Sequence, residues 1–317
     1  MAKIDNFFST IKTRDFGTSL SAVFNLCAKT VEEIIFGRRY LERRIHNYKM
    51  LLDVKDKGLS RNLILFRTRE EDHKILLEKI MNPKMRVFDI GANIGYYALM
   101  ELDLLDDEKQ LVAFEPVSEN VSLLKRNLAL NGYNDVTVLN AAISDTNGER
   151  EFYFAEESNL GSFHKSNLNQ SSRSGGVSNV KTMTYTEAVE QCGLPDLIRM
   201  DVEGHEVEIM SQIVEMVAAQ KKSPTIIFET HLRHYNSERD FRSVLDRFFS
   251  LGYCVPHVAS SQASGTEKLI SRGYKPYQMV RTDGLVRGLF SDIKPKDASE
   301  LITELGGIRT VVLAKND

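Results

Sequence analysis

Residues 86–95 read Arg86–Val87–Phe88–Asp89–Ile90–Gly91–Ala92–Asn93–Ile94–Gly95, an apolar strand followed by a turn between two glycines. Because glycine has no Cβ, the chain can turn tightly at Gly91 and Gly95, and a ligand can approach the backbone there. A helix that begins near Gly95 would direct its free N–H groups at that ligand. Glu115 ends a second apolar strand, where a carboxylate can accept hydrogen bonds from ribose hydroxyls. The stretch is therefore typical of α/β proteins that bind adenosine-containing cofactors.

The middle position of this turn is Asn93, so the three-glycine fingerprint of dinucleotide-binding proteins is not met. This departure weakens the case for a nicotinamide cofactor, although Glu115 would suit the ribose of NAD equally well. A plain strand-to-helix connection that binds no ligand is also an alternative, because a single glycine motif is a weak signal. We keep an NAD-dependent oxidoreductase and a non-catalytic cofactor-binding protein as alternatives.

The composition is that of an ordinary globular protein. The chain has 317 residues, of which 42% are hydrophobic, and its formal net charge is −3 with both signs interspersed. Without a basic field, nucleic-acid binding is not expected, and no apolar run is long enough to span a bilayer. We expect small molecules or other proteins as partners.

The three cysteines, Cys27, Cys192 and Cys254, are isolated in the sequence. An odd number of cysteines with no Cys-x-x-Cys pair predicts reduced thiols in a reducing compartment. The charged residues near the N-terminus are not those of a secretory signal peptide. We therefore expect a cytoplasmic location.

Three segments differ in their hydrophobic pattern. Residues 1–60 are expected to form a helical N-terminal extension, because apolar residues such as Leu20 and Phe24 recur at helical spacing. Such an extension would act as a cap or in homo-oligomerisation. Residues 61–258 alternate strands and helices, as in a mainly parallel sheet flanked by helices, and residues 259–317 are expected to complete that sheet.

Two polar stretches leave alternatives open. A cluster of arginines forms either a solvated helix face or a clamp for an anionic substrate: Arg38, Arg39, Arg43 and Arg44. Residues 155–179 are rich in Ser, Asn and Gly. A loop of this length is either a lid that orders over bound substrate or a segment with no role.

Several short motifs after the glycine turn occur in the order found in one enzyme family. They are Phe88–Asp89–Ile90–Gly91–Ala92–Asn93–Ile94–Gly95–Tyr96–Tyr97, Ala113–Phe114–Glu115–Pro116, Lys125–Arg126–Asn127–Leu128 with Asn131–Gly132, Asn140–Ala141–Ala142–Ile143–Ser144, and Asp201–Val202–Glu203–Gly204–His205–Glu206. With these residues the chain resembles the FkbM family of S-adenosylmethionine-dependent methyltransferases. Asn93 matches the family's own turn, and Arg199 stands where the family more often has lysine, which is also cationic.

The resemblance implies a class I methyltransferase fold. This fold is α/β and Rossmann-like, with a seven-stranded, mostly parallel sheet, helices on both faces and one reversed strand. Either Arg309–Leu313 or the strand from Tyr253 to Val258 would supply the reversed strand. The resemblance also implies S-adenosylmethionine as the cofactor and O-methylation of a hydroxyl. The expected acceptor is a small molecule, a glycan or a lipid-linked compound.

The cofactor residues follow from the rule that ligands of doubly wound folds bind beyond the carboxyl ends of the strands. We assign to the methionine end of the cofactor Asp89, Gly91, Asn93 and Gly95. We assign Glu115 to its ribose and Ala142 to its adenine.

Candidates for catalysis are Asp201, Glu203, Glu229 and His231, which also lie at strand ends. In one scheme His231 is the general base that takes the proton of the acceptor hydroxyl, oriented by a neighbouring carboxylate. In the other scheme Asp201, Glu203 and Glu229 hold a divalent cation such as Mg²⁺, which lowers the pKa of that hydroxyl. The metal-free scheme is slightly favoured.

Each of these residues also has an alternative role. Glu229 would otherwise be the buried partner of Arg199 or of another cation, and His231 an ordinary loop histidine. His205 and Glu206 begin the following helix, where we expect a capping or surface role.

Overall fold

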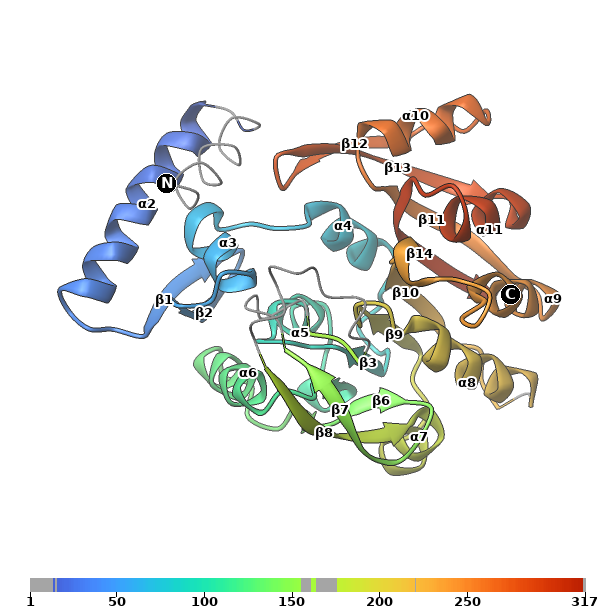
Figure 1. Ribbon diagram of the computed structural model, residues 1–317, viewed down its shortest axis with the longest axis horizontal. Coiled ribbons are helices and arrows are strands. Elements are labelled where there is room, and N and C mark those ends of the chain that lie inside the picture. The colour runs from blue at the N-terminus through green and yellow to red at the C-terminus, as the bar shows by residue number, and fades with distance from the viewer. Residues whose placement is uncertain (1–13, 15, 155–160, 164–175, 220, 316–317) are drawn as a thin grey trace.

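The computed structural model describes residues 14, 16–154, 161–163, 176–219 and 221–315. Across these residues, nine strands form one sheet in the order β12-β13-β11-β14-β10-β9-β3-β4-β5 (Figure 1). The strands are β3 (Val87–Ile90), β4 (Leu111–Phe114), β5 (Thr137–Leu139), β9 (Leu197–Met200), β10 (Thr225–Glu229), β11 (Tyr253–Ser260), β12 (Gln278–Thr282), β13 (Leu285–Ile293) and β14 (Ile308–Lys315).

The strand directions are those of a class I methyltransferase. Strands β5, β4, β3, β9 and β10 are parallel, whereas β14 is antiparallel to both of its neighbours, β10 and β11. The expected α/β fold is therefore confirmed. The reversed strand is β14, which contains Arg309–Leu313, and not β11, which contains Tyr253–Val258. The sheet has nine strands rather than seven because the hairpin β12–β13 pairs with β11.

Helices cover both faces of this sheet. They are α3 (Leu59–Phe66), α4 (Glu71–Ile80), α5 (Tyr96–Leu102), α6 (Ser118–Leu130), α7 (Tyr185–Cys192), α8 (Glu206–Ala218), α9 (Phe241–Ser250), α10 (Ala263–Ser271) and α11 (Pro295–Thr303), with 3₁₀ turns at Glu108–Gln110 and Leu232–His234. Adjacent residues of β3 face opposite sides: Val87 belongs to the apolar core shared with α4, α5 and α6, and Phe88 to the core shared with α7, α8 and α9. Both faces are buried, which explains why β4 is wholly apolar and why β3 and β9 have only one charged residue each, Asp89 and Arg199.

A second, three-stranded sheet follows β5 in the chain. Its strands are β6 (Ala142–Ser144), β7 (Gly148–Tyr153) and β8 (Val177–Thr184), with β8 in the centre. Most of the stretch 155–179, which was expected to be a lid or a loop, lies outside the described residues. Its last residues belong to β8, so the expected loop is too long at this end.

The N-terminal segment is only partly helical. Helix α2 spans Phe16–Ile34, but β1 (Tyr40–Ile45) and β2 (Tyr48–Asp53) form a hairpin where a helix was expected. The reason is a two-residue period: Tyr48, Met50 and Leu52 are buried while Lys49 between them is exposed. In this hairpin, Leu51 donates a backbone hydrogen bond to the side chain of Asn127 on α6 (2.7 Å).

The four arginines of this segment do not line the cavity described below. Arg38 pairs with Glu32 and Arg39 with Asp53, both at 3.0 Å. Both side chains are exposed, but they lie between α2 and β1, and Arg43 and Arg44 lie on β1, so the expected helix face is wrong for this cluster. Among the described residues, no helix is both long and apolar enough to cross a membrane.

Candidate active site

The glycine turn joins β3 to α5. Gly91 has φ +84°, and a Cβ at this residue would lie 2.2 Å from the backbone oxygen of Asp201. Gly95 has φ +92°, and its Cβ would lie 2.6 Å from Cδ1 of Leu124. Asn93 also has positive φ (49°), a conformation that asparagine tolerates better than most residues. Gly91 is thus required by the close approach of a backbone atom, whereas at Gly95 the Leu124 side chain can move and the positive φ is what favours glycine; the sequence suggested the approach of a ligand.

A cavity of about 770 Å³ lies beside this turn, over the carboxyl ends of β3, β4 and β9. The predicted site residues that line it are Gly91, Asn93, Glu115, Ala142, Asp201 and Glu203. The other predicted residues lie outside this lining: Asp89, Gly95, Glu229 and His231. The structure therefore brings six of the ten predicted residues together around one cavity, and the other four are not part of its lining.

Glu115 lies at the end of β4 and fixes the conformation of the turn. Its carboxylate accepts hydrogen bonds from the backbone N–H of Asn93 (2.9 Å) and of Val117 (2.9 Å), and from the side chain of Asn120 (3.2 Å). Burial raises the pKa of Glu115 to about 7, although these hydrogen bonds oppose the rise. Glu115 is therefore a structural support of the turn as well as part of the cavity wall.

Asp89 is fully buried, and it reaches the cavity only through Arg199. Nη1 of Arg199 lies 3.2 Å from Oδ1 of Asp89 and donates a hydrogen bond to the backbone oxygen of Gly91 (3.3 Å). Nη2 of Arg199 pairs with Asp201 (3.4 Å), and the guanidinium lies 3.7 Å from the ring centre of Tyr97. Burial raises the pKa of Asp89, and Arg199 opposes that rise. One buried arginine thus connects the end of β3, the glycine turn and Asp201.

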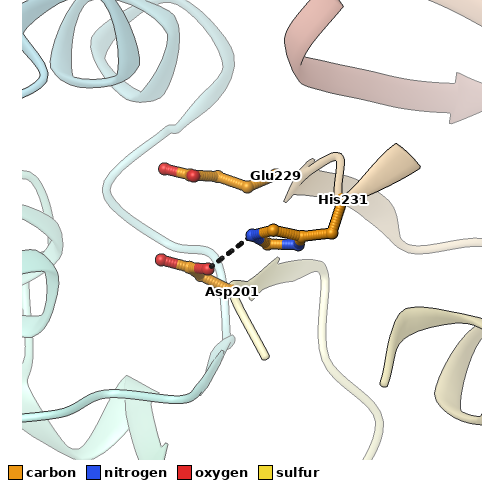
Figure 2. Close-up of side chains that lie close together, drawn as sticks. All are labelled: Asp201, Glu229 and His231. Atoms are coloured by element: carbon orange, nitrogen blue, oxygen red, sulfur yellow. Dashed lines mark ion pairs between the residues drawn. The ribbon is translucent and has the colours of Figure 1, made fainter. Parts of the chain in front are cut away.

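The four predicted catalytic side chains lie close together. Asp201, Glu229 and His231 each offer one atom within 4.8 Å of the others, and Figure 2 shows their side chains pointing toward one another. Nε2 of His231 is 3.9 Å from Oδ1 of Asp201 and 3.5 Å from Oε2 of Glu203. The expectation that these strand ends converge is met in the geometry.

His231 is held on its other side by Glu206. Oε1 of Glu206 lies 2.8 Å from Nδ1 of His231 and also accepts a hydrogen bond from the backbone N–H of Gly204 (3.0 Å). Glu206 and His205 are both buried, so the expected surface role of these two residues is wrong. Burial alone would lower the pKa of His231, but Glu206, Glu203 and Asp201 together raise it to about 10. His231 is therefore an imidazolium at neutral pH, which is a poor state for a general base.

Glu229 is paired with a cation that sequence reasoning did not identify. Both of its carboxylate oxygens lie 2.9 Å from Nη2 of Arg309 on β14, and the same atom is 2.6 Å from Oε1 of Glu70. Burial raises the pKa of Glu229 to about 8, with Arg309 opposing. The alternative role of Glu229, as the buried partner of a cation other than Arg199, is the one observed.

Glu203 differs from its neighbours because it both lines the cavity and adopts an unusual backbone. Its φ is +46°, and Gly204 follows with φ +93°. Ser162 donates a hydrogen bond to the backbone oxygen of Glu203 (3.1 Å). Burial raises the pKa of Glu203 to about 7, and the charge of His231 opposes this rise. A non-glycine residue in the left-handed region costs about 1–3 kcal/mol, and such residues cluster at functional sites.

The fold and this cavity define a class I methyltransferase. Residues 89–255 match the model of the methyltransferase FkbM domain, which is more than half of the chain. The chain therefore belongs to the FkbM family of S-adenosylmethionine-dependent methyltransferases, as the sequence motifs predicted. The NAD-dependent oxidoreductase is not favoured by this membership.

Solved structures similar to the chain include TYW2 of P. horikoshii in complex with MeSAdo, which is 13% identical with a TM-score of 0.41 over 91% of this chain and 82% of that chain. A putative O-methyltransferase from Klebsiella pneumoniae is 10% identical (TM-score 0.40, 79% of this chain and 82% of that chain). The methyltransferase FkbM from Methylobacillus flagellatus KT is 12% identical (TM-score 0.35, 73% and 52%). No curated protein matches the chain.

Proposed function

We propose that this methyltransferase binds S-adenosylmethionine in the cavity and transfers its methyl group to a hydroxyl of a small molecule, a glycan or a lipid-linked acceptor. The observation that carries the proposal is the arrangement of the cavity wall. The glycine turn and Glu115 lie on one part of it, and Asp201 and Glu203 on another. In this proposal the cofactor site and the acidic side chains share one space, so that the methyl donor and a proton acceptor can be aligned with the acceptor hydroxyl.

The cofactor would lie along the turn from Gly91 to Asn93. In this proposal Glu115 contacts the ribose and Ala142 the adenine, while Asp89 acts through Arg199 on the methionine end. The four predicted residues outside the cavity lining, Asp89, Gly95, Glu229 and His231, would hold the lining residues in position. The backbone N–H of Asn93 is already bound to Glu115, so the ribose would share that carboxylate with the turn.

The chemistry needs alignment and one proton acceptor. The acceptor oxygen attacks the methyl carbon of the sulfonium, the C–O bond forms as the C–S bond breaks, and S-adenosylhomocysteine leaves. The hydroxyl proton passes to a carboxylate. We assign this role to Glu203 rather than to His231, because Glu203 lines the cavity and His231 lies behind it as an imidazolium.

His231 then acts as a positioning residue. Its ring lies between Glu206 and Glu203, at 2.8 Å and 3.5 Å. It fixes the orientation of Glu203 and balances the charge of the carboxylates around it. Asp201, held by Arg199, completes the acidic wall.

A metal-assisted scheme is the second candidate mechanism. The atoms brought together are those of Asp201, Glu229 and His231, with His231 in place of the predicted Glu203. The ion pair of Glu229 with Arg309 and that of His231 with Glu206 already satisfy two of these groups. The metal-free scheme is therefore preferred, and chelation with EDTA followed by addition of Mg²⁺ separates the two. Turnover that disappears under chelation and returns with the ion would replace the assignment of Glu203.

The proposal is tested by calorimetry and by formation of S-adenosylhomocysteine with a panel of hydroxyl compounds. We expect Glu203→Gln to lower kcat by about 10²–10⁴-fold, the usual contribution of a general base, with cofactor affinity nearly unchanged. Glu115→Ala should lose cofactor affinity, and the exposed Glu238→Gln should change neither value. Binding of NADH without binding of S-adenosylmethionine would refute the proposal. Wild-type turnover in Glu203→Gln would refute the catalytic role alone.

A cytoplasmic location stays a prediction. It is supported by the three cysteines, which are free thiols in the structure.

A further inference from the structure

Helix α2 carries its apolar stripe on the side that faces away from the rest of the molecule. The exposed fraction is 61% for Leu20, 74% for Phe24, 43% for Val31 and 74% for Ile34, and Cys27 is exposed between them. The opposite side of the helix packs on α3, where Ala22 is fully buried. A surface helix normally turns its apolar stripe toward the core of its own chain, whereas α2 turns this stripe toward solvent.

Polar contacts hold α2 in this orientation. The side chain of Asn25 donates a hydrogen bond to the backbone oxygen of Leu65 (2.9 Å), and Arg67 donates to the side chain of Asn25 (3.3 Å). Figure 1 shows α2 at one edge of the molecule, beside α3 and apart from strands β10 to β14. The exposed stripe is therefore a fixed feature of the fold.

The stripe has the spacing of a coiled-coil seam. Its members, Leu20, Phe24, Cys27, Val31 and Ile34, follow one another at intervals of four and three residues, the heptad period by which two helices pack against each other. The positions that flank the seam carry no charge: Ser21, Val23, Ala28, Thr30 and Ile35. Two copies of such a surface can meet without charge repulsion, as a two-fold contact requires.

We propose that two copies of this chain associate through the α2 seam. The exposed apolar side chains of α2 and of Ile35 and Phe36 would bury about 1,200–1,500 Å² when counted over two copies, from about 200 Å² for each fully exposed large side chain. Stable interfaces begin at about 1,200 Å². The area is therefore sufficient for a dimer.

Charge favours a second copy over a membrane surface. Helices that lie in a membrane interface have a polar face rich in Lys and Arg. The polar side of α2 has one lysine, Lys29, and two glutamates, Glu32 and Glu33. Lys29 is itself paired with Glu33 (2.9 Å), and Arg38, beyond the helix, is paired with Glu32.

Cys27 lies at the centre of the seam, seven residues from both Leu20 and Ile34. In a parallel pair of helices aligned in register, and in an antiparallel pair centred on this residue, each Cys27 faces that of the second copy. A disulfide needs Cα atoms within about 7 Å. Mild oxidation with copper phenanthroline is therefore expected to give a covalent dimer that Cys27→Ser abolishes, while Cys192 and Cys254 remain.

The association is measured by sedimentation velocity of the full chain across a concentration series. We expect a dimer whose dissociation constant rises by at least 100-fold in the double variant Phe24→Glu/Ile34→Glu. The matched control is Ile270→Glu on α10, where the side chain is also half exposed. It should leave the dimer unchanged. Binding of S-adenosylmethionine by the double variant shows that it is folded and separates this test from that of the proposed function.

Three outcomes would overturn the proposal. One is a monomer at all concentrations together with a Cys27 that does not cross-link, which would mean that another part of the same chain covers the seam. Another is a dimer that persists in the double variant. The third is binding of the monomeric wild type to phosphatidylserine vesicles that the double variant loses, which would assign the seam to a lipid surface.

Discussion

The substitution Gly91→Ala tests the glycine turn between β3 and α5, which forms part of the cavity wall. An alanine Cβ would lie 2.2 Å from the backbone oxygen of Asp201, whereas ordinary contact begins at 3.4 Å. The two strand ends would therefore have to separate by about 1.2 Å. Because the obstructing atom belongs to the backbone, it cannot move aside as a flexible side chain would.

The expected cost has two parts. A non-glycine residue at φ +84° costs about 1–2 kcal/mol, and forcing extra volume into a packed site costs about 1–3 kcal/mol. We expect Gly91→Ala to lower the free energy of unfolding by about 2–5 kcal/mol. Gly132→Ala isolates the first part, because Gly132 has φ +88° and a Cβ there would meet nothing within 4 Å. That variant should lose about 1–2 kcal/mol.

Urea denaturation of both variants measures the free energies, and calorimetric titration measures the affinity for S-adenosylmethionine. The gain from restricting the unfolded chain is similar for both substitutions, so their difference reports the contact with Asp201. We expect cofactor affinity to fall in Gly91→Ala only. Equal stability and equal affinity in the two variants would refute the packing argument.

Two further predictions concern charge. Arg199→Met leaves the buried Asp89 without its partner, which should cost about 3–5 kcal/mol at pH 8, whereas Arg199→Lys should cost much less. Burial already raises the pKa of Asp89, so the folded state takes up a proton more readily than the unfolded state. The loss of unfolding free energy in Arg199→Met, measured by urea denaturation, should therefore be smaller at pH 5 than at pH 8. A loss that does not depend on pH would contradict the role of Asp89. Burial raises the pKa of Glu203 to about 7, so kcat/KM, which reports the groups of the free enzyme, should fall about tenfold per pH unit below that value as the carboxylate is protonated. The same inflection in the pH–rate profile of Glu203→Gln would assign it to another group.

The architecture of the sheet follows from local signals. Strands β3, β4 and β9 are four-residue runs buried on both faces, and their mostly apolar composition, with a turn signal after β3, favours strands. The turn of the hairpin β12–β13 is Asp283–Gly284, a pair typical of two-residue hairpin connections, and both residues have positive φ, 53° and 77°. In contrast, β1 and β2 were missed because Leu41 and Ile45 are also compatible with a helical period. Strand β8 was missed because the polar stretch before it hides its start.

The ion pairs of the site could not be predicted in the same way. Arg309 is 80 residues from Glu229 and 239 from Glu70 in the chain, and no local pattern connects them. Glu206 was within a recognised motif, but its helical position suggested solvent. In the structure this buried carboxylate meets His231, 25 residues further along the chain. The ends of the strands could therefore be predicted from the sequence. Which side chain is proposed as the general base and which as a positioning residue depends on contacts that only the three-dimensional structure shows.

The charge balance of the site explains why Glu203 can accept a proton near neutral pH. Six buried or half-buried carboxyl groups surround the cluster: Glu70, Asp89, Asp201, Glu203, Glu206 and Glu229. Five cations oppose them: Arg69, Arg199, His231, Arg233 and Arg309. Burial raises the pKa of Glu203 to about 7 and that of Glu229 to about 8, and the charge of the neighbouring Asp201 adds to both rises.

In the proposed reaction, the bound cofactor changes this balance twice. Bound S-adenosylmethionine would bring a sulfonium charge into the cavity that Glu203 lines, which would favour the ionised form of this carboxylate. S-adenosylhomocysteine has a neutral thioether, so methyl transfer would remove that charge. Glu203 would then hold the proton of the acceptor hydroxyl more readily after the transfer than before it.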